Sequence, residues 1–214
     1  MSHVLYPKLY NKMKLLKQYF NSISPLSEET WKEVSLLFTK KKLSANAYFV
    51  EENKHAKEIA FLEKGSIRAF FTNSEAKEYN KQFFVAPSII GAYTSLLTKE
   101  KNLIPQQALT ECILWVADYS ELEKLFNQFH DFEKLGRKIA EYYFLEKEKK
   151  ELEMALMDAT ERYLLFKKQF PSLEQLIPQY QIASYLSVSP TQLSRLRNKL
   201  LKIKQPALFL SLPM

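Results

Sequence analysis

Cysteine and glycine are both scarce in this 214-residue chain, which has one Cys and three Gly. The single Cys112 has no internal partner for a disulfide, and one thiolate does not make a metal site. Because Cys112 lies in the alternating apolar run 109–116, we expect it to be buried in a strand. The glycines Gly65, Gly91 and Gly136 are too sparse for a phosphate-binding loop or a dinucleotide fingerprint.

Histidine is equally rare, and His3, His55 and His130 fall in three separate segments. A cupin-type metal site needs several histidines and a carboxylate around one ion, so these positions predict no metal site. G-x-S-x-G is also absent, and no other motif with a known catalytic mechanism occurs. We therefore expect neither enzymatic activity nor a cofactor.

Long apolar runs are missing as well. No segment approaches the roughly 18 apolar residues that cross a bilayer. The first ten residues carry Lys8 without the apolar region of a secretory signal. The sequence therefore predicts a cytoplasmic protein with no membrane partner.

Positive charge is concentrated near the C-terminus. The formal net charge is +7. From Thr160 onward the chain has eight Lys or Arg residues and only two acidic residues, Glu161 and Glu174. A basic segment of this kind indicates a polyanionic partner, because neutralised phosphates release their condensed counterions.

The hydrophobic pattern predicts an α+β fold. Residues 6–20 and 27–38 have helical spacing, and Ser27 is placed as the N-cap of the second helix. From about residue 43 to 117, short alternating runs separated by polar breaks predict a small β-sandwich or barrel.

Helical spacing returns after Tyr119 and predicts one long helix, followed by a helix at 160–170 that Pro171 ends. The apolar stripe of this region consists of Leu135, Ile139, Tyr142, Leu145, Leu152, Leu156 and Tyr163. A symmetric partner helix would bury the stripe and make a homodimer. An amphipathic helix lying on its own β-domain would give the same pattern.

The segment 179–200 has the spacing of two helices that pack across a tight turn. Ser189, Pro190 and Gln192 mark the start of the second helix as a capping box with proline at its first position. The apolar positions that we expect to pack together are Ile182, Ala183, Leu186, Val188, Leu193, Leu196 and Leu200. An ordinary αα-hairpin with a solvated basic face is the alternative, but packing, caps and local charge all favour a DNA-binding helix-turn-helix.

The second helix is expected to present its polar side to double-stranded DNA. The candidates for reading base edges are Thr191, Gln192, Ser194, Arg195 and Asn198. Arg pairs well with guanine, Gln or Asn with adenine, and a hydroxyl with either. The candidates for contacting phosphates are Ser189 at the helix N-terminus, Arg197, Lys199 and Lys202.

Over nearly its whole length the chain resembles the Crp/Fnr family of bacterial transcription regulators, which includes the cyclic-AMP receptor protein. The similar segments are 61–71, 89–93 with 107–109, the long helix, 159–163, and 182–186 through 193–196. The last of these looks especially like the Bacteroidetes-type members.

The resemblance implies three parts. They are a cyclic-nucleotide-binding-like β-roll (a jelly roll, or double-stranded β-helix) at 1–125, a dimerisation helix at 126–159 and a winged helix-turn-helix domain at 160–214. It implies a homodimer that reads an inverted-repeat operator through the helix 190–200, with RNA polymerase as a further candidate partner. Thr191, Gln192 and Arg195 stand where the family reads bases.

Two departures from the family concern the effector. Members that bind cyclic AMP carry Gly-Glu-Leu and Arg-Ser/Thr-Ala in their phosphate-binding cassette, where this chain has Gly91-Ala92-Tyr93 and Gln106-Gln107-Ala108. The arginine that neutralises the cyclic phosphate is missing, so we predict no tight binding of cyclic nucleotides. Cys112 alone also excludes the cysteine-ligated iron–sulfur centre of some members.

Two alternatives remain for the β-roll. One is a neutral polar pocket for an unknown small-molecule effector, with Arg68 placed to meet an acid and with walls formed by Tyr79, Gln82, Tyr93, Gln106 and Gln107. The other is a degenerate pocket that binds nothing, which also fits a signalling or protein-interaction module.

The end of the chain departs from the family as well. Residues 202–214 are few and broken by Pro206, so we expect a short or missing wing. The apolar residues 208–210 would dock as a single strand.

Overall fold

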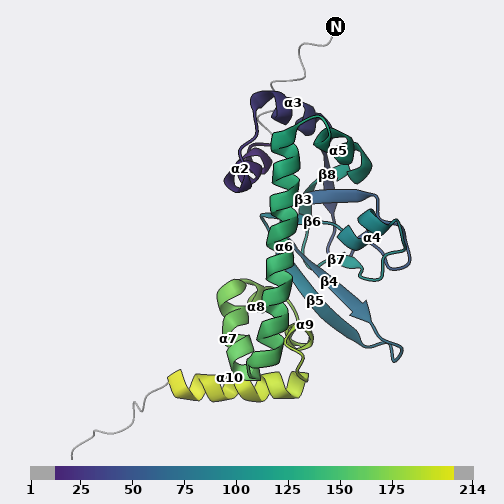
Figure 1. Cartoon of the computed structure of the whole chain (residues 1–214). Coiled ribbons are helices and arrows are strands. Elements are labelled where there is room, and N and C mark those ends of the chain that lie inside the picture. The colour runs from purple at the N-terminus through teal and green to yellow at the C-terminus, as the bar shows by residue number, and fades with distance from the viewer. Residues whose placement is uncertain (1–12, 205–214) are drawn as a thin grey trace, which may run out of the picture.

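The computed structural model describes residues 13–204, and their side chains as far as residue 201. Helices come first, then a region that consists mainly of strands, then helices again, as Figure 1 shows. The α+β prediction is therefore confirmed. α2 spans Lys14–Ile23, so the helix expected at 6–20 lies partly outside the described residues.

α3 (Glu28–Leu36) begins where the sequence predicts. The Ser27 hydroxyl accepts a hydrogen bond from the Thr30 backbone N–H at 3.1 Å, as an N-cap does. The Ser27 N–H and the Thr30 hydroxyl donate in turn to the Asp131 carboxylate, at 2.8 and 2.7 Å. The cap therefore also joins α3 to the start of the long helix α6 (His130–Leu156).

The β-domain consists of two four-stranded antiparallel sheets, with strand orders β1-β8-β3-β6 and β2-β7-β4-β5. The strands are β1 (Thr39–Leu43), β2 (Tyr48–Val50), β3 (Glu58–Lys64), β4 (Ser66–Thr72), β5 (Glu78–Val85), β6 (Ser88–Ile90), β7 (Gln106–Ala108) and β8 (Cys112–Asp118). A short helix, α4 (Tyr93–Thr98), lies between β6 and β7. Apolar side chains from both sheets fill the interior, so the expected β-roll is confirmed.

The turn between β3 and β4 requires a glycine. Gly65 has a φ of +100°, and a side chain there would come within 2.6 Å of Cys112 Sγ. Cys112 is fully buried in β8, as predicted. Burial raises the pKa of its thiol, which keeps the group neutral and unreactive at neutral pH.

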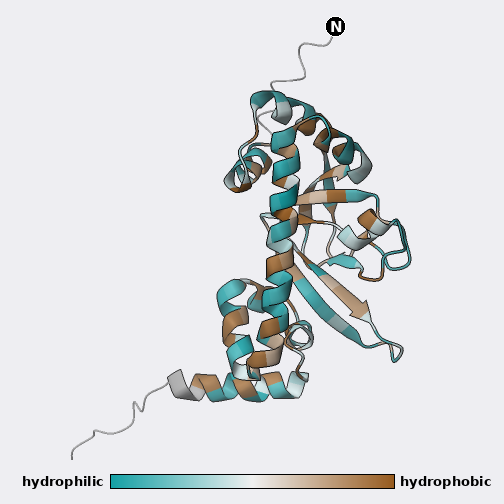
Figure 2. Ribbon diagram, viewed as in Figure 1, coloured by the Kyte–Doolittle hydropathy of each residue, from teal (hydrophilic) through white to brown (hydrophobic). Residues whose placement is uncertain are grey.

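The long helix α6 follows α5 (Tyr119–Phe126) and runs from the β-domain to the C-terminal helices (Figure 1). Its first third is covered by its own domain, since Leu135 and Ile139 pack in one cluster with Phe61 and Trp115. The remaining α6 residues of the predicted stripe, Tyr142, Leu145, Leu152 and Leu156, are exposed in the protomer. In Figure 2 hydrophobic and hydrophilic residues alternate along the exposed part of α6.

The predicted stripe is therefore divided. Leu135 and Ile139 lie on their own domain, and Tyr163 belongs to a separate helix, α7 (Ala159–Gln169). Asp158 separates the two helices by forming a capping box with Glu161 at the start of α7. Only the exposed part of α6 is left for a partner helix.

Three further helices complete the described chain: α8 (Leu173–Leu176), α9 (Gln179–Tyr185) and α10 (Pro190–Lys204). No strand occurs between residues 157 and 204. A short or missing wing is expected in residues 202–214, of which only 202–204, the end of α10, are described, and the strand expected at 208–210 lies outside the described residues. Within residues 13–204 every helix is too short or too polar to cross a membrane.

Candidate functional site

α9 and α10 form a helix-turn-helix in which the predicted apolar positions meet. Ile182, Ala183, Leu186 and Leu193 are buried, and Val188, Leu196 and Leu200 pack against the same cluster. The turn is closed by the Val188 N–H, which donates to the Ala183 carbonyl oxygen at 3.0 Å. Ser187 supports this turn with a φ of 54°, a left-handed conformation common just after a helix.

The start of α10 is fixed by the expected capping box. Gln192 N–H donates to Ser189 Oγ at 3.1 Å, and Ser189 N–H donates to Gln192 Oε1 at 2.8 Å. Gln192 is exposed, but its side-chain oxygen is engaged at the cap. It must leave the cap to form a bidentate pair with adenine.

The outward side of α10 is polar as far as Lys199, and the apolar Leu201, which is 64% exposed, follows near the end of the described side chains. Its exposed residues include Thr191, Gln192, Ser194, Arg195, Asn198 and Lys199, whereas Leu193 is fully buried. The base-reading candidates are thus brought together on one accessible face, with Lys199 beside them. The side chain of Lys202 lies outside the described residues.

Arg197 has different surroundings from its neighbours on α10. Its Nε lies 3.3 Å from Glu174 Oε1, and the other oxygen of Glu174 lies 3.7 Å from Lys167 Nζ. The Tyr163 hydroxyl also donates to Glu174. Burial, together with this carboxylate, raises the pKa of Tyr163 to about 12. Arg197 therefore ties α10 to α8 and α7, a role that the sequence did not indicate.

The core of the helix-turn-helix is completed by a residue of the β-domain. Phe83 of β5 is buried against Phe166, Phe170 and Tyr185, with ring centroids 6.2, 6.0 and 4.9 Å away. Consecutive Phe83 and Phe84 could have indicated that both faces of this strand are covered. As a result, β5 and α9 lie side by side (Figure 1).

The six residues expected to line an effector pocket do not converge. Tyr79 stacks on Phe71 at 5.2 Å toward the tip of the β4–β5 hairpin, where Phe71 is exposed. Tyr93 instead contacts the ring of Tyr119 at 5.9 Å. Gln82 lines a third place, a cavity between the β-domain and the C-terminal helices.

The other three candidates for the pocket, Arg68, Gln107 and Gln106, do not all lie together either. Arg68 donates to Gln107 Oε1, so these two lie together. Strand alternation puts them on the opposite face of the sheet from Ile67, which is in the interior. Gln106 is buried, and its Oε1 has no hydrogen-bond partner among the described residues. The six side chains are therefore not brought together in the protomer, in part because neighbours along a strand point to opposite faces.

The cavity lined by Gln82 has a volume of about 440 Å³. Its walls include α6, where Lys150 Nζ lies 4.0 Å from Glu153 and 3.7 Å from the ring centroid of Tyr185. Burial lowers the pKa of Lys150 to about 8, despite the attraction of the Glu153 carboxylate.

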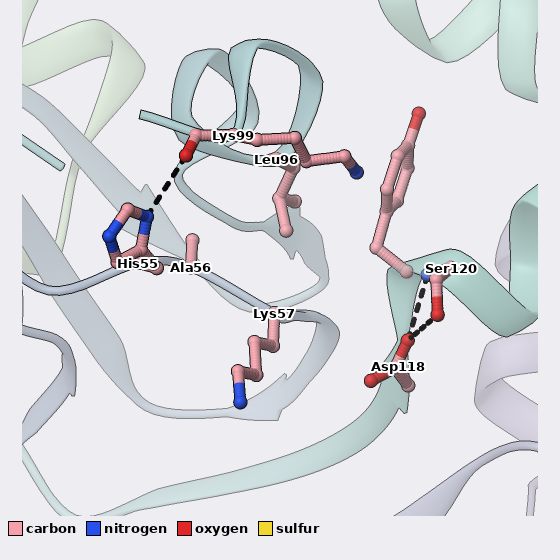
Figure 3. A pocket seen from close by; sticks show the side chains of 8 residues that line it. His55, Ala56, Lys57, Leu96, Lys99, Asp118 and Ser120 are labelled. Carbon is pink, nitrogen blue, oxygen red and sulfur yellow. Dashed lines mark hydrogen bonds between the residues drawn. The ribbon is translucent and has the colours of Figure 1, made fainter. Parts of the chain in front are cut away.

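A smaller pocket of about 310 Å³ lies between α4 and the start of α5 (Figure 3). His55 Nδ1 donates to the Lys99 carbonyl oxygen at 3.0 Å. The Asp118 carboxylate caps α5 by accepting from the Ser120 N–H and hydroxyl at 2.8 and 2.6 Å. In this pocket the His55 ring and the Asp118 carboxylate thus find their hydrogen-bond partners among the other lining residues. Within the described residues, no three His, Cys, Asp or Glu side chains are grouped as metal ligands.

The chain combines an antiparallel β-roll, a long connecting helix and a helix-turn-helix, in the order that the resemblance to the Crp/Fnr family implies. Residues 40–129 match the family model described as the cyclic nucleotide-binding domain. The chain thus contains a cyclic-nucleotide-binding-like domain, and it has the α+β fold of Crp/Fnr regulators. The more specific Bacteroidetes-type assignment stays a prediction.

Solved structures with this fold include FixK2 from Bradyrhizobium japonicum, with a TM-score of 0.67 and 16% identity over 78% of this chain and 86% of that one. The c-di-GMP responsive global regulator CLP from Xanthomonas campestris has a TM-score of 0.66 and 14% identity, over 83% and 93%. A Crp/Fnr family regulator from Eubacterium rectale has a TM-score of 0.66 and 12% identity, over 83% and 85%. Among curated protein sequences no match is found.

Proposed function

We propose that this chain is a DNA-binding transcription regulator, not an enzyme, which acts as a homodimer and reads an inverted-repeat operator through α10. The observation that carries the proposal is the accessible polar face of α10, held outward because Leu193 is fully buried on the opposite side. The likeness in fold to known regulators supports it.

In this proposal the groups on α10 divide by chemistry. Thr191, Ser194, Arg195 and Asn198 read base edges in the major groove, and Gln192 joins them when it leaves its cap. The candidates for phosphate contacts are Ser189, Lys199, Lys202 and, in part, Arg197. Arg197 contributes less because its guanidinium already pairs with Glu174.

The dimer would form through the exposed part of α6. Leu145 and Leu152 are seven residues apart, and Leu156 follows four residues later, so the three share one face of the helix. Pairing this face with its copy around a two-fold axis would bury it. Two α10 helices would then enter successive major grooves about 34 Å apart.

Selecting bound oligonucleotides from a random pool tests DNA binding, symmetry and half-site spacing together. We expect an inverted repeat, and an affinity that falls steeply with salt, with a log–log slope of about −0.9 per phosphate contact. A helix-turn-helix that binds another protein is the alternative function. It would give no enriched sequence and an interaction nearly independent of salt.

Substitutions on α10 separate reading from positioning. Arg195→Ala should weaken binding by about 1–3 kcal/mol at one base position, whereas Lys199→Ala should weaken binding to all sequences alike. Equal losses on operator and random DNA for the Arg195 variant would refute its role in reading bases.

We also propose that the β-roll does not bind cyclic AMP tightly, and that its effector is an unknown small molecule or none. Ala92 and Gln106 stand at the cassette positions and carry no charge. The nearby Arg68 faces away from the sandwich interior and is already paired with Glu78. Isothermal titration with cyclic AMP should show no binding in the micromolar range, and a micromolar or tighter affinity would overturn this.

A further inference from the structure

A group of polar side chains with a buried centre joins the β-domain to the helix-turn-helix. This interdomain polar cluster consists of Arg68 from β4, Glu78 and Asn80 from β5, Gln107 from β7, and Gln181 and Ser184 from α9. Arg68, Asn80 and Gln181 are each no more than 6% exposed. The cluster therefore lies at the contact between two parts of the chain that are about 100 residues apart.

Arg68 is at the centre of the cluster. Its Nε and Nη2 both donate to Gln107 Oε1, at 2.9 and 2.7 Å. Its Nη1 donates to Glu78 Oε2 at 2.5 Å and to Gln181 Oε1 at 3.0 Å. Contacts on both sides hold the planar guanidinium in one orientation, so it joins β7 to α9.

Asn80 and Ser184 add bonds between β5 and α9. The Asn80 side-chain amide donates to the Gln181 backbone oxygen at 2.9 Å. The Asn80 N–H donates to Ser184 Oγ at 2.9 Å, and this hydroxyl donates to the Glu78 backbone oxygen at 3.0 Å. Each bond crosses between the two parts, and its direction restricts how α9 can lie on the strand.

These contacts bear on α10 through α9, because the two helices share a core. The apolar contact through Phe83 holds α9 against β5, but apolar packing alone permits small rotations and slides. Buried hydrogen bonds do not, since a displaced partner leaves a desolvated polar group unsatisfied. The cluster uses α9 only and leaves the outward residues of α10 exposed, so it orients this helix without covering it.

We infer that Arg68 and Gln181 are positioning residues that set the angle of α10 relative to the dimer axis. They thereby determine which spacing between operator half-sites the dimer accepts. This inference rests on the proposed function, and it assigns specificity to residues that do not touch DNA. In a rigid dimer the distance and angle between the two α10 helices are fixed. Both helices can therefore enter their half-sites only when the half-sites have the matching spacing.

The test compares wild type with Arg68→Met and Gln181→Leu on operators whose half-site spacing differs by one or two base pairs. Wild type should prefer one spacing, and both variants should bind this spacing about tenfold more weakly, equivalent to about 1.4 kcal/mol. They should also lose most of the preference between spacings. Binding to an isolated half-site should change less than twofold, because the reading face of α10 is intact.

Two controls separate positioning from damage to the fold. Lys77→Met removes a cation from the same β4–β5 hairpin without touching the cluster, and it should keep the wild-type spacing preference. The double variant should be no worse than either single one, since both changes break the same contact. Amide hydrogen exchange at Asn80 should be faster in both variants, and this readout does not require DNA.

The outcomes distinguish the two proposals. If wild type binds no DNA, the proposed function fails, whatever hydrogen exchange reports about the cluster. If wild type prefers one spacing and the variants keep that preference, the positioning role is overturned while DNA binding stands. Equal losses on half-sites and full operators would likewise overturn it, because they indicate a damaged helix-turn-helix.

Discussion

Arg197 and Lys199 lie two residues apart on α10, but Arg197 is half-buried and paired with Glu174, whereas Lys199 is exposed. Arg197→Ala removes the ion pair with Glu174 and should lower the free energy of unfolding by about 1 kcal/mol. Lys199→Ala, at an exposed position, should change it by less than about 0.5 kcal/mol. Urea unfolding of the two variants measures the difference, and equal stabilities would contradict the structural role of Arg197.

Lys150 gives a pH dependence that can be measured directly. Burial lowers its pKa from an ordinary value of 10.5 to about 8. Between these values the folded protein has released the proton that the unfolded chain still holds, so this group makes the free energy of unfolding rise with pH. Below pH 8 both states are protonated, and its unfavourable contribution is constant.

Lys150→Met should therefore remove one component of the pH profile. The difference in unfolding free energy between wild type and variant should increase from about pH 8 to 10.5 and be flat below this window. Chemical denaturation at a series of pH values measures it. Two profiles that stay parallel across the window would show that the lysine titrates normally.

At the scale of the element, α10 depends on its capping box. Ser189→Ala removes the acceptor for the Gln192 N–H and should destabilise the helix-turn-helix by about 1 kcal/mol. Ser189→Asp keeps an acceptor at this position, so stability should be retained. Its negative charge would face the phosphates, so DNA binding should fall although the fold is intact. Thermal unfolding and DNA titration of the pair separate the two effects.

Elements with a local chemical pattern could be predicted from the sequence. The caps at Ser27 and Ser189 depend on residues three positions away, and both form as expected. Strand alternation also identifies the β-roll, since a period of two needs only neighbouring residues. For the same reason, the polar face of α10 follows from the burial of Leu193 and from the packing of the half-buried Leu196 against the same cluster.

Contacts between distant segments could not be predicted in this way. Arg68 and Gln181 are 113 residues apart, and no periodicity relates them. One of the two alternatives for the β-roll places Arg68 to meet an acidic effector, whereas its guanidinium pairs with Glu78 across the hairpin. The apolar repeat continues past Asp158 to Tyr163, so periodicity alone does not show that a helix ends between them. The cap at Asp158 marks this end.

At the scale of the whole molecule, the proposed dimer depends on α6. Leu145 and Leu152 are about 60% exposed in the protomer, so Leu145→Glu with Leu152→Glu should leave the protomer stable. The same changes would place charges in the dimer interface, and sedimentation should show dissociation to monomers. Binding to the full operator should then fall toward that of a half-site.

A matched control is available in the β-domain. Leu97 and Leu103 are 52% and 68% exposed and distant in sequence from α6, so Leu97→Glu with Leu103→Glu introduces the same two charges elsewhere. This variant should sediment like wild type. If the α6 variant also stayed dimeric, another surface would have to hold the two copies together.

Phe83 has a consequence for any attempt to exchange modules between regulators of this type. The aromatic rings of α7 and α9 rest on a side chain that belongs to β5, and a Phe→Ala truncation in such a core costs about 3–5 kcal/mol. A fragment cut at the end of α6 would open this hydrophobic surface to water. A chimera that joins these C-terminal helices to the sensor domain of another protein must therefore include the β4–β5 hairpin of this chain. Otherwise the other sensor domain must provide an aromatic side chain at the position of Phe83.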